Sequence, residues 1–107
     1  MKNLGAMMKQ VQEMQVRMQE MQARLETMEI EGRAGGGLVS VVLSGKGTLK
    51  TVRIDASLMK ADEREILEDL IIAAHAEARA RMEEKVAAEM KEVTGGLPLP
   101  PGFQLPM

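Results

Sequence analysis

The chain has no cysteine, tryptophan or tyrosine, and Phe103 and His75 are each the only residue of their kind among its 107 residues. Without cysteine there is no disulfide framework and no thiolate metal site, which suits a reducing compartment. With Phe103 in the tail as its only Phe, Tyr or Trp residue, the chain has no platform on which single-stranded bases could stack. No apolar run resembles a signal peptide or a membrane span, so we expect a cytoplasmic protein with no membrane partner.

Groups that could carry catalysis are equally scarce. We expect His75 to lie in the middle of a helix, where a packed or boundary role is far more common than a catalytic one, and no spacing around it suits a metal or a nucleophile. The glycine segments 35–37 and 45–47 each lead into a strand and not into a helix, so neither predicts a phosphate loop. The sequence therefore predicts no enzyme, no cofactor, no metal site and no small-molecule substrate.

The chain does have a regular apolar seam of the coiled-coil type along its first quarter. Apolar residues recur at alternating steps of three and four, which predicts one long helix over residues 4–27. Much of the seam is methionine, which packs adaptably. A stripe this narrow favours a helical partner, either the second helix of the chain or a second copy, over a helix that lies on its own sheet. The seam consists of Leu4, Met7, Val11, Met14, Met18, Met21, Leu25 and Met28.

The period of the pattern then changes to two. Residues 28–34 alternate, residues 38–44 form a β-branched and aliphatic run, residues 48–55 alternate again, and glycines separate the three segments. We therefore expect a three-stranded antiparallel meander with one face available for helices and two exposed edges.

A second helix is predicted to begin near Asp62, whose carboxylate can form a capping box with Glu65. It continues to about residue 94, and a run of alanines keeps its middle thin enough for another helix to approach. All four prolines of the chain lie in the tail 95–107, which is either disordered or an extended strap that docks its leucines and phenylalanine in a groove. The fold class is α+β in α-β-β-β-α order, with one domain over residues 1–94 and the Gly/Pro-rich C-terminal tail over 95–107.

Nucleic acid is the partner that the charge pattern leaves open. The formal net charge is −2, so duplex DNA would have to be met by a local surface, through phosphate contacts that do not read sequence. A symmetric dimer could clamp a duplex between two helical arms. The competing interpretation is a solvated helix surface with internal ion pairs such as Glu13–Arg17 and Glu20–Arg24. The candidate DNA-binding residues are Lys2, Lys9, Arg17, Arg24, Arg79, Arg81 and Lys85.

Several segments of the chain, in order and without large gaps, resemble the YbaB/EbfC family of bacterial nucleoid-associated proteins. They are residues 7–15 (MMKQVQEMQ), 31–39 (EGRAGGGLV), 45–47 (GKG), 54–58 (IDASL), 67–74 (LEDLIIAA) and 97–103 (LPLPPGF). The resemblance implies a tweezer-shaped homodimer, paired through its sheets and helices, with no catalytic motif. It also implies binding of duplex DNA in the nucleoid, with effects on nucleoid organisation and gene expression.

A non-enzymatic interaction module, such as a chaperone-like clamp, is the alternative function. Methionine surfaces suit promiscuous hydrophobic or helical partners. This alternative gains support if the seam methionines stay exposed in the assembled protein, and it loses support if they are buried.

Overall fold

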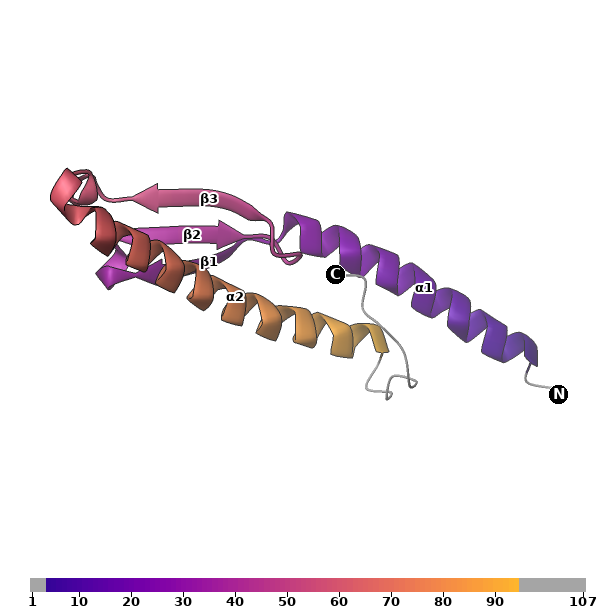
Figure 1. The fold of residues 1–107 in the computed structure, drawn as a ribbon. Helices are drawn as coiled ribbons and strands as arrows, with labels where there is room; N and C mark the ends of the chain where they lie inside the picture. Colours follow the sequence, from indigo (N-terminus) through magenta and orange to yellow (C-terminus); the bar gives the residue numbers. More distant parts are fainter. Residues whose placement is uncertain (1–3, 95–107) are drawn as a thin grey trace.

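The computed structural model describes residues 4–94, so Lys2 and the tail 95–107 lie outside the described part (Figure 1). The elements follow the predicted α-β-β-β-α order, and short 3-10 turns at Gly35–Gly37, Ala56–Leu58 and Ala61–Glu63 connect some of them. Each element lies within a few residues of its expected position. The helices and strands are α1 (Leu4–Thr27), β1 (Ile30–Ala34), β2 (Val39–Leu43), β3 (Leu49–Ile54) and α2 (Arg64–Thr94).

The three strands form the predicted antiparallel meander, with β2 in the centre. Cross-strand pairs place Gly32 opposite Val41 and Val41 opposite Val52, so these three residues share one face of the sheet. The turn between β1 and β2 has positive φ angles of 65°, 69° and 97° at residues 35, 36 and 37. Only glycine adopts such angles without strain, which explains the glycine triplet as a turn.

Helix α2 crosses β1 and β2 on one face of the sheet (Figure 1). The side chains of β2 that share this face, Val39, Val41 and Leu43, are fully buried. At the crossing point a Cβ on Gly32 would lie 2.2 Å from the carbonyl oxygen of Ala74 and 2.7 Å from the Cβ of Ala78. The alanines of α2 therefore allow close approach to a strand, and the expectation that they admit another helix was wrong for this part of α2.

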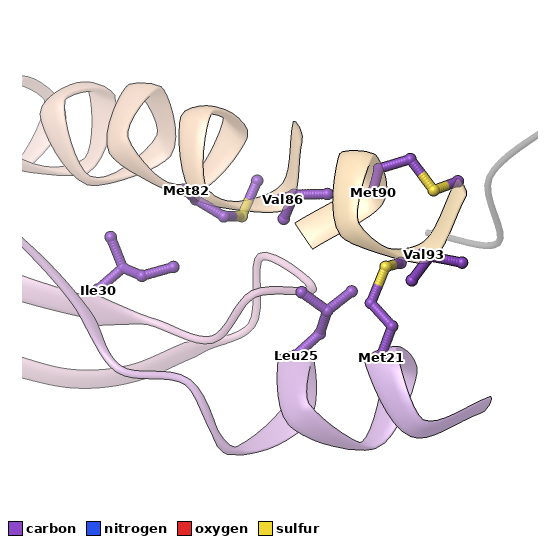
Figure 2. Packing of buried hydrophobic residues seen from close by; sticks show 7 residues of the cluster. All are labelled: Met21, Leu25, Ile30, Met82, Val86, Met90 and Val93. Carbon is purple, nitrogen blue, oxygen red and sulfur yellow. The ribbon is translucent and has the colours of Figure 1, made fainter. Parts of the chain in front are cut away.

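A second core lies beyond the sheet, where the last half of α2 packs against the end of α1 (Figure 2). Met14, Met18 and Met28 are half-buried and pack against this core from α1 and the segment that follows it. The second helix, one of the two predicted partners of the seam, thus covers its C-terminal half. The buried members of this core are Met21, Leu25, Ile30, Met82, Val86, Met90 and Val93.

The start of α2 differs from the prediction. Lys60 is the N-cap of the 3-10 turn Ala61–Glu63, which leads directly into the helix, and no side chain caps this turn. Asp62 lies inside the turn and not before it, so it does not form the predicted capping box with Glu65. Its carboxylate still lies near the positive end of the helix dipole, where negative charge is favourable.

The described chain is elongated, with extents of 72 × 22 × 18 Å, because α1 continues past the end of α2 (Figure 1). The first half of the α1 seam has no cover within residues 4–94, and Leu4, Met7 and Val11 are each more than half exposed. Neither helix of the described part combines the length and the apolar character that crossing a membrane requires.

We expect Gly32→Ala to lower the free energy of unfolding by about 1–3 kcal/mol or more, because the added methyl group must push α2 away from β1. Thermal and denaturant unfolding followed by circular dichroism measure this change. Gly5→Ala is the matched control, since a Cβ at Gly5 meets nothing within 4 Å. Equal stability of the two variants would contradict the close approach of α2 and β1.

Candidate nucleic-acid interface

Helix α1 carries two exposed cations, Lys9 on its projecting part and Arg17 between the half-buried Met14 and Met18. They are separated by about 12 Å along the helix, at ~1.5 Å per residue. Neither forms an ion pair within residues 4–94, and the expected Glu13–Arg17 pair is absent there. Both charges are therefore available to an external anion. They belong to a shallow groove along α1 lined by Lys9, Gln12, Glu13, Val16, Arg17 and Glu20.

Arg24 is the third predicted cation of α1, and the structure gives it a different partner from the expected one. Its Nε and Nη2 donate to Oε2 of Glu89 on α2, at 3.2 and 2.9 Å. The predicted pair with Glu20 is therefore not formed. This contact connects the C-terminal end of α1 to α2, and the carboxylate of Glu89 offsets part of the charge of Arg24.

The cations of α2 are mostly offset by acidic neighbours. Arg79 lies 3.4 Å from Glu83, and Arg81 lies 3.3 Å from Glu77. Arg81 also donates to the backbone oxygen of Glu31 at 3.2 Å, which ties α2 to β1. The structure therefore places the candidate residues in two separate groups, one on the arm α1 and one on α2 beside the sheet.

Two further candidates complete the predicted set. Lys85 is exposed on α2, and it forms no ion pair in the part of the chain that the structure describes. Lys2 lies outside the described residues. The cations without an acidic partner, counted over the described positions of the candidate set, are thus Lys9, Arg17 and Lys85.

The β2–β3 hairpin contacts the C-terminal end of α1, the helix that forms the arm. The N–H of Gly45 donates to the carbonyl oxygen of Leu25 at 2.8 Å, and a Cβ at Gly45 would lie 2.9 Å from the Cα of Leu25. The Lys46 ammonium lies 2.9 Å from Oε1 of Glu26 and lowers the pKa of that carboxyl by its hydrogen bond and its charge. The buried hydroxyl of Ser44 accepts the N–H groups of Lys46 and Thr48, at 3.1 Å each, and so shapes the loop.

Four further exposed cations, none of them among the predicted DNA-binding residues, lie around β3 and the start of α2. Lys50, Arg53, Lys60 and Arg64 form no ion pair with any residue in the range 4–94. Arg53 pairs across the sheet with Ser40, on the face opposite α2. The alternation of residues 48–55 was the signal that could have placed Arg53 on this open face.

The described residues form no cluster that could bind a metal ion. Among residues 4–94 no three His, Cys, Asp or Glu side chains lie close enough to hold a metal ion. His75 is half-buried on α2, as expected for a boundary position. No buried side-chain polar atom of the described part lacks a hydrogen-bond partner.

Comparison with known proteins connects this arrangement to a family. The YbaB/EbfC DNA-binding family matches residues 1–97. The chain belongs to this family. The resemblance found in the sequence is therefore confirmed, and the YbaB/EbfC family comprises non-enzymatic, nucleoid-associated DNA-binding proteins.

Individual relatives agree with this assignment. The chain is 56% identical over 106 residues to a nucleoid-associated protein of Brucella ovis, with 99% of each chain covered, and equally similar to one of Brucella melitensis. An uncharacterized protein of Helicobacter pylori, known from a crystal structure, matches with a TM-score of 0.72 at 22% identity. This match covers 89% of the present chain and 97% of the other, and it shows that the two proteins share the α+β fold.

We expect Lys46→Met to raise the pKa of Glu26 toward its ordinary value of 4.5, because the substitution removes both the hydrogen bond and the charge that lower it. A carbon-detected NMR titration of side-chain carboxyl groups measures this shift. Asp55 is the internal control, since the hydroxyl and N–H of Ser57 keep its pKa low. The Lys46–Glu26 contact favours folding above pH 4.5, and this contribution is lost as the pH falls through the lowered pKa. An unchanged Glu26 titration would contradict the contact.

Proposed function

We propose that this protein binds duplex DNA in the nucleoid as a homodimer, through phosphate-backbone contacts from its helix surfaces, and so affects nucleoid organisation and gene expression. One observation carries the proposal: in a chain of a DNA-binding family, the arm α1 presents Lys9 and Arg17 without acidic partners in the described part. Contacts of this kind are independent of sequence and strongly dependent on salt.

The distribution of charge supports α1 as the main contact. The whole chain has a formal charge of −2, so an approach over its entire surface is not favoured. On α2 the candidate cations Arg79 and Arg81 each face a glutamate one turn away. A rod that projects from the body can bring its cations to phosphates while the acidic side chains of α2 remain at a distance.

The uncovered half of the sheet supports the homodimer. On β3, Val52 and Ile54 pair with Val41 and Val39, which α2 buries, so the same apolar face continues past the helix. There it is uncovered, with Leu49 51%, Val52 42% and Ile54 36% exposed. An apolar strip on an edge strand invites association. A second copy related by a two-fold axis would cover the strip with its own and would give the assembly two α1 arms.

For DNA binding we expect the double substitution Lys9→Gln with Arg17→Gln to weaken the affinity. Each lost phosphate contact reduces the slope of log K against log salt by about 0.9. Fluorescence anisotropy of a short labelled duplex at several salt concentrations measures both quantities. The matched control is Lys50→Gln with Lys60→Gln, which removes the same charge from positions outside the helices. An equal loss in the control, or an unchanged slope in the α1 variant, would contradict contact through α1.

For the assembly we expect Val52→Glu to shift the protein from dimer to folded monomer, because the substitution places an unpaired charge in the proposed interface. Sedimentation velocity gives the mass, and circular dichroism shows whether the monomer is folded. Thr51→Glu is the control, since Thr51 lies next to Val52 on the opposite face of β3. A Val52→Glu variant that remains dimeric would place the interface elsewhere.

A chaperone-like clamp is the second candidate function, and one observation favours it. Met7 and Met8 are exposed on α1 within the described chain, so a methionine-rich surface is available to hydrophobic clients. Suppression of client aggregation in the absence of DNA, lost on replacement of both methionines by glutamine, would support this function. Aggregation that proceeds unchanged in the presence of the protein would exclude it.

A further inference from the structure

The first half of the α1 seam becomes uncovered where α2 ends, and we propose that the C-terminal tail of the same chain, residues 95–107, lies along it. Going back along α1, Met21 is buried, Met18 and Met14 are half-buried, and Met7 and Leu4 are exposed. The burial of the seam by α2 thus decreases over about two turns of α1. An apolar seam left in water over several more turns is a surface to which an apolar segment can bind.

The end of α2 delivers the tail to this place. Val93 belongs to the same buried cluster as Met21 and lies opposite it (Figure 2). Helix α2 runs in the direction opposite to α1, so a chain that leaves α2 without turning continues toward the N-terminal end of α1 (Figure 1). The tail therefore begins beside the half-buried part of the seam.

The tail is long enough to cover the rest. From Met18 to Leu4 the helix extends about 21 Å at ~1.5 Å per residue. Residues 95–107 in a polyproline conformation extend about 40 Å at ~3.1 Å per residue. Roughly half of the tail therefore spans the open seam, and the remainder allows for the change of direction after α2.

The chemistry of the tail matches the seam. The tail has no charged side chain, and its apolar residues are spaced by prolines that limit the conformational freedom lost on docking. The ring of Phe103 can contact methionine thioethers, a favourable pairing. Lys9 and Arg17 line a groove that includes no seam residue, so a docked tail leaves these cations accessible. The docking residues of the tail are Leu97, Leu99, Phe103 and Leu105.

A single spin label tests the proposal on the full chain. Because the chain has no cysteine, Gln104→Cys creates one site for a nitroxide. In protein with labelled methionine methyl groups, we expect the nitroxide to broaden the signal of Met7 strongly. Met59, exposed at the far end of the sheet, should keep its intensity. Absence of broadening at Met7 would overturn the proposal, whether or not DNA binding and dimerisation are observed.

Two further samples show whether the contact lies within one chain or between two copies, and which tail residues form it. Protein with methyl labels and no nitroxide is refolded together with unlabelled protein that carries the nitroxide, and we expect Met7 to remain sharp there. Broadening in this mixture would mean that the tail lies on a second copy, which overturns docking within one chain. In the spin-labelled protein, Leu97→Ser, Leu99→Ser and Phe103→Ser together should restore the Met7 signal, whereas Gly102→Ser should leave it broadened. Broadening that persists in the triple variant would overturn the assigned docking residues.

Discussion

The direction of α1 depends on the contact between its last turn and the β2–β3 hairpin. Gly45 leaves room for the backbone of Leu25 and donates a hydrogen bond to it, and no residue with a side chain fits at that distance. Lys46 and Glu26 reinforce the contact at the surface, where an ion pair contributes little by itself. Because this junction joins the arm to the sheet, the positions of all cations on α1 depend on it.

A second close approach determines what remains uncovered. Gly32, Ala74 and Ala78 let α2 lie directly on β1, and this places the helix over one side of a narrow sheet. A single helix at this position covers β1 and β2 and leaves the apolar residues of β3 in solvent. The same small residues that stabilise the packing of α2 on β1 thus leave an apolar strip of Leu49, Val52 and Ile54 uncovered on β3 in the described chain.

The sequence predicted the order and the approximate bounds of every helix and strand, because periods of 3.5 and 2 report which side of an element is buried. Charged contacts were harder to predict. Arg24 pairs with Glu89, which is 65 residues away in sequence, and not with Glu20 one helical turn away. The spacing of residues within one helix cannot predict a partner on another helix. The predicted capping box of α2 is not formed, because the 3-10 turn Ala61–Glu63 places Asp62 inside a turn and not before the helix. For the candidate cations that form ion pairs, the sequence therefore predicted the helix on which each lies but not the acidic residue with which it pairs.

Lys9 on α1 is well separated from the acidic side chains of α2. At physiological salt, charges further apart than about 8 Å are largely screened from one another. Cover by α2 ends near Met14, and Lys9 lies about 8 Å further along α1 at ~1.5 Å per residue. The glutamates of α2 therefore act strongly on Arg79 and Arg81 and weakly on Lys9. The net charge of −2 therefore does not describe α1, in which three cations, Lys9, Arg17 and Arg24, are matched in number by three glutamates.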